Sequence, residues 1–144
     1  MKRPFRPVSA NKGFTLVEVL VTVVIFSVGL LGLAGLQATG IKLNHSSLIR
    51  SQATLLVYDI VDCMRANRTN VANYALAKSD GKPTTLTTQA DRDLDEWLTN
   101  LSAYLPSGDG AVTLNGNRAT VQVWWDDTRD PSLPFTTMTV TSEI

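Results

Sequence analysis

The stretch KGFTLVE, residues 12–18, opens an apolar run that continues to Leu36. A helix over residues 14–36, at about 1.5 Å rise per residue, is long enough to cross a hydrocarbon core about 30 Å thick. Glu18 is the single charged residue of that run. An ionisable group at such a depth costs about 2.5–3.5 kcal/mol on insertion scales, so it usually has a partner and a function. The sequence therefore predicts a transmembrane helix and a functional role for Glu18.

Basic residues gather on one side of the apolar run. Lys42 and Arg50 follow it, whereas four basic residues precede it, namely Lys2, Arg3, Arg6 and Lys12. Positively charged flanks stay on the cytoplasmic side of a membrane helix. We therefore expect a cytoplasmic leader, and we expect the rest of the chain to face the periplasm or its equivalent.

Two motifs give the chain a resemblance to a known family. The short basic leader ending in Gly13, the sequence FTLVE (residues 14–18) and the long apolar helix resemble the class III signal of type IV pilins and pseudopilins. The glycine-spaced run GLLGLAGLQ (residues 29–37) and the later RANR (residues 65–68) are similar to the minor-pilin family called type IV pilus modification protein PilV. The resemblance is specific over the first half of the chain and looser beyond it.

The resemblance implies a processing site. A membrane-embedded prepilin peptidase would cut between Gly13 and Phe14 and would N-methylate Phe14. Glu18 would neutralise the terminal amine of a neighbouring subunit during assembly. Electrostatics agrees with this role, because a new ammonium on Phe14 would lie four residues before Glu18 in a layer of low dielectric constant. The other interpretation of Glu18 is a carboxylate that merely lies at headgroup level.

On this resemblance we expect a minor pilin subunit that assembles, primes or modifies a type IV pilus by helix packing with other pilins. It would be a single-pass protein of the bacterial inner membrane, with or without incorporation into the fibre. The implied partners are the prepilin peptidase, the membrane assembly platform, other minor pilins and the major pilin. A pseudopilin of a type II secretion system shares the signal, Glu18 and the helix, and the sequence hardly separates the two.

A soluble periplasmic binding protein with a cleaved ordinary signal peptide is a third interpretation. Gly32-Leu33-Ala34 has the small-x-small pattern of a cleavage site. The apolar stretch 19–36 is longer than the usual apolar region of about 7–15 residues in such peptides, and a glutamate before it is unexpected. These two features favour the membrane helix.

Beyond Leu36 the apolar residues form a stripe with helical spacing, made of Ile49, Ala53, Leu56, Ile60 and Cys63 or Met64. The stripe predicts one continuous helix from Phe14 to about Asn67, about 80 Å long, whose second half packs against a globular head. Four glycines lie where its halves meet: Gly29, Gly32, Gly35 and Gly40. They provide either pliability or close helix packing.

The remaining residues predict a small mixed head. Residues 67–87 predict a loop, and Thr88 with Asp91 predicts a capping box that opens a short helix ending at Pro106. The buried face of this helix would carry Leu94, Trp97, Leu98, Leu101 and Leu105. Alternating apolar residues then predict a hairpin turning at Asn115-Gly116 and a third strand over residues 135–142.

The predicted fold class is therefore α+β, and the resemblance implies that it is pilin-like. Its long N-terminal helix, membrane-spanning in the first half, packs on a head with a short helix and an antiparallel sheet of about three strands. We expect a leader over residues 1–13, a transmembrane half over 14–36, an exposed half over 37–69 and a periplasmic head over 70–144. The 144 residues carry 13 basic and 13 acidic side chains, a balance without a nucleic-acid signature.

Little in the sequence indicates chemistry, so we expect no enzyme, metal or cofactor. The run Asp91-x-Asp93-x-Asp95 resembles the start of a calcium loop, but Glu96 replaces the turn glycine. Helix-dipole stabilisation explains these acidic residues better. His45 is the only histidine, and no histidine or cysteine lies close to it in sequence.

Three further features of the head allow more than one interpretation. Asp126 and Asp127 have the pairing of a two-carboxylate hydrolase, although adjacent aspartates usually begin a solvated loop. Trp124 and Trp125 would suit adhesion to a surface ligand if exposed, although alternation along a strand lets only one of them face the core. The lone Cys63 is expected to be an apolar filler rather than an intermolecular crosslink.

Overall fold

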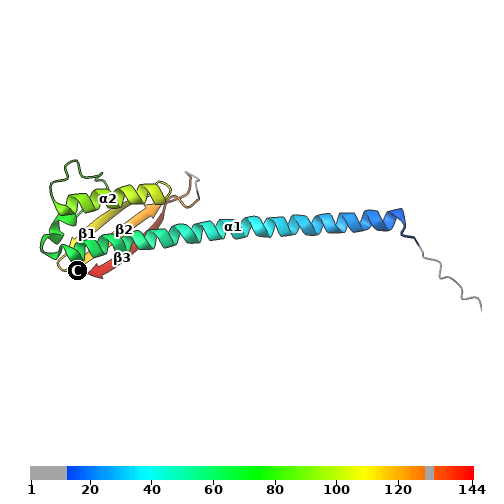
Figure 1. Ribbon diagram of the computed structural model, residues 1–144, viewed down its shortest axis with the longest axis horizontal. Helices are drawn as coiled ribbons and strands as arrows, with labels where there is room; N and C mark the ends of the chain where they lie inside the picture. The colour runs from blue at the N-terminus through cyan, green and yellow to red at the C-terminus, as the bar shows by residue number, and fades with distance from the viewer. Residues whose placement is uncertain (1–12, 129–131) are drawn as a thin grey trace, which may run out of the picture. The chain divides into compact units, whose positions relative to one another are not determined.

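The computed structural model describes residues 13–128 and 132–144. In chain order the elements are α1 (Leu16–Ala66), η1 (Arg68–Tyr74), α2 (Gln89–Tyr104), β1 (Asp109–Asn115), β2 (Arg118–Trp125) and β3 (Thr136–Glu143) (Figure 1). The chain divides into two compact units, Met1–Lys42 and Leu43–Ile144, and α1 contributes to both. This set of helices and strands fits the predicted α+β, pilin-like fold.

Helix α1 confirms the predicted continuous helix, with no break at the glycines. In the second unit its buried face carries Ile49, Ala53, Leu56, Val57, Ile60, Val61 and Met64. The sequence left Cys63 and Met64 as alternatives for the last position of the stripe. Met64 is fully buried, whereas Cys63 lies half-buried at the margin of the core.

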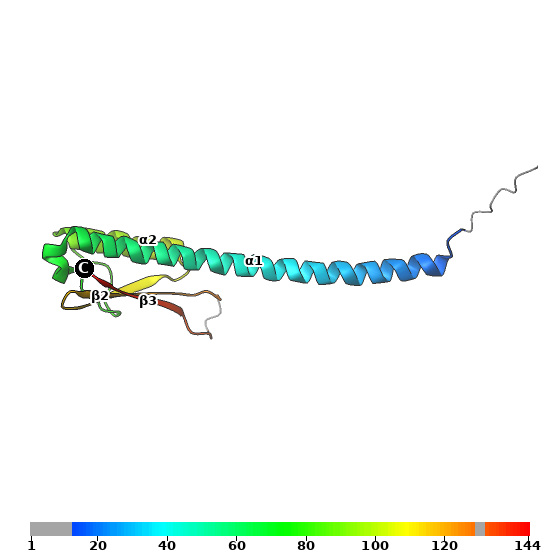
Figure 2. The same ribbon diagram turned by 90° about the horizontal axis from the view of Figure 1, so that it is seen from below.

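The second unit has two layers, as Figure 2 shows, with α1 and α2 on one side and the sheet on the other. Trp97 of α2 lies where they meet, and its indole N–H donates to the backbone oxygen of Leu56 at 2.9 Å. A Cβ at Gly110 would overlap the Trp97 ring. Only glycine therefore lets β1 approach the indole this closely.

Helix α2 begins at the predicted capping box. The Thr88 hydroxyl accepts from the Asp91 N–H at 3.1 Å, and the Asp91 carboxylate accepts from the Thr88 N–H at 2.7 Å. All five residues of the predicted apolar face are buried. Hydrogen bonds from Thr88 to its charged form hold the pKa of Asp91 below the usual range.

The sheet is antiparallel with the order β1-β2-β3, which confirms the hairpin and the third strand. The predicted turn position is wrong by one residue. Asn115 pairs with Arg118, so the loop residues are Gly116 and Asn117. Gly116 has a φ of +59°, as the first loop position of a type II′ turn requires.

The connection over residues 67–87 is more ordered than the predicted loop. It contains η1 and an isolated bridge between Leu76 and Val112. The side chain of Tyr74 is buried; its hydroxyl donates to the Asp93 carboxylate of α2 and lies 3.4 Å from the Cys63 backbone oxygen of α1. The sequence predicted a loop because this stretch is polar. The partners that order it are distant in sequence, so the local pattern did not reveal them.

The predicted leader lies outside the described residues except for Gly13, and so do its basic residues. The predicted limits of the leader, the membrane half and the head remain predictions. The division after Lys42 follows the contacts between residues, and it marks neither a cleavage site nor a membrane boundary.

Candidate functional site

The predicted processing site lies in non-helical backbone. Gly13, Phe14 and Thr15 precede α1, and the Phe14 side chain is 83% exposed. A Cβ at Gly13 would have no neighbour within 4 Å. The Glu18 N–H donates to the Thr15 hydroxyl at 3.3 Å, which is a contact typical of a helix N-cap. Among the described residues the Gly13–Phe14 peptide bond is therefore exposed and outside the helix.

Glu18 lies in the first turn of α1 with an exposed side chain. Among residues 13–128 and 132–144, its carboxylate forms no ion pair and accepts no hydrogen bond. Phe14, which precedes the helix, lines the same open surface cleft as Glu18. The carboxylate is free to take a cationic partner from outside this chain.

Every residue from Phe14 to Thr39 is exposed. Most are large and apolar, and the hydroxyls among them bond to their own helix. The Thr22 hydroxyl donates to the backbone carbonyl oxygen of Glu18 at 2.7 Å, and the Ser27 hydroxyl donates to the backbone carbonyl oxygen of Val23 at 2.7 Å. Such internal bonding leaves an apolar outer surface that water does not solvate well.

Within the described residues, α1 is long and apolar enough to cross a membrane, and no residue of its most apolar stretch is buried. The glycines of this region, Gly29, Gly32, Gly35 and Gly40, would each accept a Cβ without contact. Close packing at these glycines therefore needs a second molecule. A peptidase cut after Ala34 would fall inside α1.

The aspartates of the head have separate structural partners. Asp127 accepts from the Ser46 hydroxyl at 2.8 Å and lies 3.9 Å from the Arg50 guanidinium. Asp126 accepts from the Thr128 N–H at 3.1 Å. Asp127 thus attaches the end of β2 to α1, and the two carboxylates accept from different donors. Sequence reasoning missed the Ser46 contact, since its partners are 81 positions apart.

The three aspartates at the start of α2 also face different groups. Asp91 caps the helix, Asp93 accepts from Tyr74, and Asp95 lies 3.9 Å from the Lys82 ammonium. The described residues contain no group of three or more metal-binding side chains. The calcium-loop resemblance therefore has no geometric counterpart.

The two tryptophans of β2 are both buried, so neither is an exposed platform for a surface ligand. Trp125, with 1% of its surface exposed, belongs to the core. Trp124 is 8% exposed and lies outside the core cluster, with the Lys78 ammonium 4.7 Å from its ring centre. Alternation along β2 does place the two rings on opposite faces of the sheet, but the connection over residues 75–87 covers Trp124 on the outer face.

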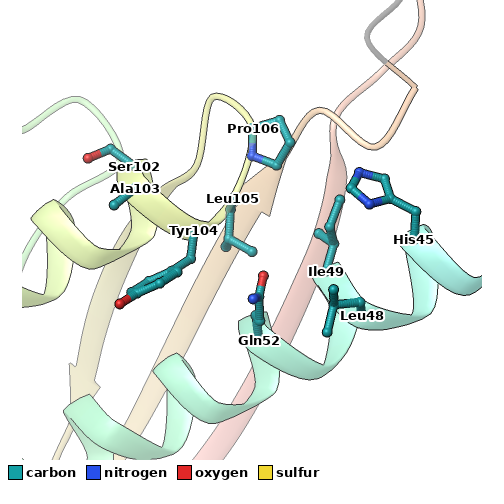
Figure 3. Close-up of a pocket in the computed structure, with 9 residues that line it drawn as sticks. All are labelled: His45, Leu48, Ile49, Gln52, Ser102, Ala103, Tyr104, Leu105 and Pro106. Carbon is teal, nitrogen blue, oxygen red and sulfur yellow. The ribbon is translucent and has the colours of Figure 1, made fainter.

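Cys63 has the properties of a structural thiol. Burial and the charge of Asp93 raise its pKa to about 11, so little reactive thiolate forms near neutral pH. His45 lines an open cleft of about 500 Å³ between α1 and the end of α2. Figure 3 shows Tyr104 and Leu105 facing Ile49 and Gln52 across this cleft. Among the described residues, no second histidine and no cysteine or carboxylate lines it.

Comparison with known proteins agrees with the N-terminal geometry. Residues 8–34 match the family model of the prokaryotic N-terminal methylation motif. No curated protein and no solved structure matches the chain. The motif covers less than half of the chain and is the class III signal of type IV pilins, a structural class rather than an enzymatic one. It implies processing by a prepilin peptidase and assembly with other pilins, and it supports a type IV pilin-like protein anchored in a membrane.

Proposed function

We propose that this chain is a minor pilin of the PilV family that assembles, primes or modifies a type IV pilus. In this proposal the leader is cut after Gly13, Phe14 becomes the N-methylated terminus, and the exposed apolar half of α1 lies in the bacterial inner membrane with the head in the periplasm. The main partners are other minor pilins and the major pilin.

The observation that carries the proposal is an exposed apolar surface with one unpartnered carboxylate. Glu18 lies in the first turn of α1, and the described residues offer it no cation. Placing such a carboxylate in a membrane unpaired is costly. The terminal amine of a neighbouring subunit would compensate that cost, which makes insertion favourable when subunits come together. Assembly is then coupled to processing, because the amine exists only after the cut.

The first test is intact-mass and N-terminal analysis of the membrane-extracted protein from its native cells. We expect a chain that begins at N-methylated Phe14. A soluble chain beginning near Gly35 would contradict the proposal, because ordinary signal peptides leave no membrane helix.

The second test separates processing from assembly. Glu18→Gln keeps the shape of the side chain and removes its charge, so we expect normal cleavage but loss of the subunit from purified pili. Asp59→Asn is the matched control, since Asp59 is an exposed carboxylate in the second half of α1. Co-purification with secretion components instead of pilus subunits would assign the chain to a type II secretion system.

A further inference from the structure

The chain has three methionines, and the structure describes two of them in contrasting surroundings. Met64 of α1 is fully buried in the core. Met138 of β3 is half-buried and packs against the core from its margin. A thioether sulfur reacts with oxidants without first losing a proton, so its accessibility decides how readily it is oxidised. The fold therefore separates an accessible sulfur from an inaccessible one.

The place of β3 in the sheet explains why Met138 is accessible. Strand β3 is the last strand of the sheet, and among residues 13–128 and 132–144 no strand lies beyond it. The opposite edge is covered, because Leu76 and Val112 of β1 exchange two backbone hydrogen bonds of 2.9 Å. Met138 pairs with Val123 of β2, which is fully buried. The sulfur therefore lies on the helix-facing side of the sheet, at its open margin.

The side chain of Met138 is also part of the attachment of β3 to α1. The Thr54 hydroxyl lies 3.7 Å from the Met138 sulfur, within the range of a weak hydrogen bond to sulfur. The same hydroxyl donates to the backbone oxygen of Arg50 at 2.9 Å, and it has only one proton. The sulfur is the weaker of the two acceptors, so its lone pairs remain available for reaction. At the other end of β3, the Arg65 guanidinium donates to the Ser142 hydroxyl at 2.9 Å.

We propose that Met138 is a reversible oxidation site whose modification loosens the attachment of β3 to α1. The oxidant is a hydroperoxide, with hydrogen peroxide as the simplest case. A sulfur lone pair attacks one peroxide oxygen, so that an S–O bond forms, the O–O bond breaks and hydroxide leaves. The hydroxide then takes the proton of the new S–OH group and becomes water. The sulfur has lost two electrons and the peroxide has gained them, which leaves methionine sulfoxide and water.

Oxidation turns a flexible apolar side chain into a polar one. The sulfoxide oxygen is a stronger acceptor than the thioether, so it competes with the Arg50 oxygen for the Thr54 proton. It also requires hydration at a position where Met138 packs against the core. Both effects favour a state in which this part of β3 lies farther from α1, whereas the contact between Arg65 and Ser142 is untouched. Methionine sulfoxide reductases reverse the change, one enzyme for each epimer.

The first measurement is the rate of oxidation at each methionine of the full-length chain in detergent micelles. Every sample carries Cys63→Ala, which removes the only thiol. After treatment with hydrogen peroxide, peptide mass spectrometry locates each added oxygen and resolves Met1, where it is retained, on a separate peptide. We expect Met138 to react at least about tenfold faster than Met64, because a fully buried sulfur reacts only when the protein opens locally. Equal rates at the two residues would overturn the proposal.

The second measurement is thermal unfolding of the head, followed by circular dichroism. The midpoint should fall when Met138 is oxidised, and treatment with both reductases should restore the mass and the midpoint together. Met138→Leu is the matched control, because it keeps an apolar side chain of similar volume without a sulfur, so its midpoint should not respond to peroxide. An unchanged midpoint in the oxidised protein, or an equal fall in Met138→Leu, would overturn the proposal. Neither result bears on the proposed pilus function, which the N-terminal analysis tests separately.

Discussion

The two segments of α1, residues 16–42 and residues 43–66, belong to one helix but have opposite surfaces. In the N-terminal segment every residue up to Thr39 is exposed, although most are apolar. In the C-terminal segment a stripe of apolar residues is buried against α2 and the sheet, and polar residues occupy much of the remaining surface. Both segments are helical throughout, so the difference lies in what each segment packs against. The N-terminal segment needs a lipid or protein environment from outside the chain, whereas the C-terminal segment builds its own core.

The largest expected effect tests the C-terminal segment alone. Trp97→Ala removes a buried indole and its hydrogen bond to Leu56, which should lower the free energy of unfolding of the head by about 3–5 kcal/mol. Denaturant unfolding followed by circular dichroism measures this loss. Membrane extraction should not change. Trp124→Ala is the control, because Trp124 lies outside the core cluster and should cost less. Equal losses would show that the two rings are not distinguished by their packing.

The next effect tests the N-terminal segment. Ile25→Arg places a charge near the middle of the apolar run and should cost about 2.5–3.5 kcal/mol of membrane insertion, leaving the head's unfolding midpoint unchanged. Alkaline carbonate extraction measures the loss of anchoring. Ser51→Arg introduces the same charge at an exposed position of the C-terminal segment and should leave extraction unchanged. If Ile25→Arg remained fully anchored, the N-terminal segment would not lie in the hydrocarbon core.

A smaller effect sharpens the description of the head. Thr88→Ala removes the side-chain cap of α2 and should lower the free energy of unfolding by about 1 kcal/mol. Thr87→Ala is a close control, because the Thr87 hydroxyl donates to Asp91 at 3.0 Å, whereas the Asp91 N–H donates to Thr88. Thermal unfolding of both variants would compare them. A loss at Thr87 as large as that at Thr88 would contradict the capping role.

The smallest effect is a pH dependence confined to the head. Burial and the hydrogen bond to Asp93 raise the pKa of Tyr74 from 10.0 to about 12. The unfolded chain therefore loses this proton first, so the contribution of Tyr74 to stability should be full below about pH 10 and fall as pH rises towards 12. Unfolding midpoints across this range should flatten in Tyr74→Phe, with a remaining slope from Cys63 between about pH 9 and 11. Tyr58→Phe, at an exposed position, should keep the wild-type profile.

Most of the fold could be predicted from local patterns. The helical stripe, the capping box of Thr88 and Asp91 and the alternation in the last strands each depend on residues within a few positions of one another. The two errors have different causes. The pairing of Asn115 with Arg118 places the turn at Gly116 and Asn117, which is a local effect. The connection containing η1 is ordered because Tyr74 contacts Asp93 of α2, which is distant in sequence.

The candidate site divides in the same way. Glu18 could be selected from sequence as the lone carboxylate of an apolar run, whereas Gly13 and Phe14 were selected through the resemblance of this stretch to the class III signal. The roles of Asp127 and Trp124 could not, since Ser46 and Lys78 come from remote elements. Composition suggested a paired-carboxylate site and an exposed aromatic surface at these positions. Tertiary contacts replaced both with structural roles.

The sequence by itself determined the long helix, its apolar N-terminal segment and the position of Glu18, because length, charge and hydropathy act without tertiary contacts. Only the tertiary structure decided which residues close the core, which tryptophan faces it and which edge of the sheet is left open. Those outcomes depend on contacts between residues far apart in the chain, such as Leu76 with Val112. No local pattern encodes them, since the same strand sequence fits an edge or a centre until its neighbours are placed.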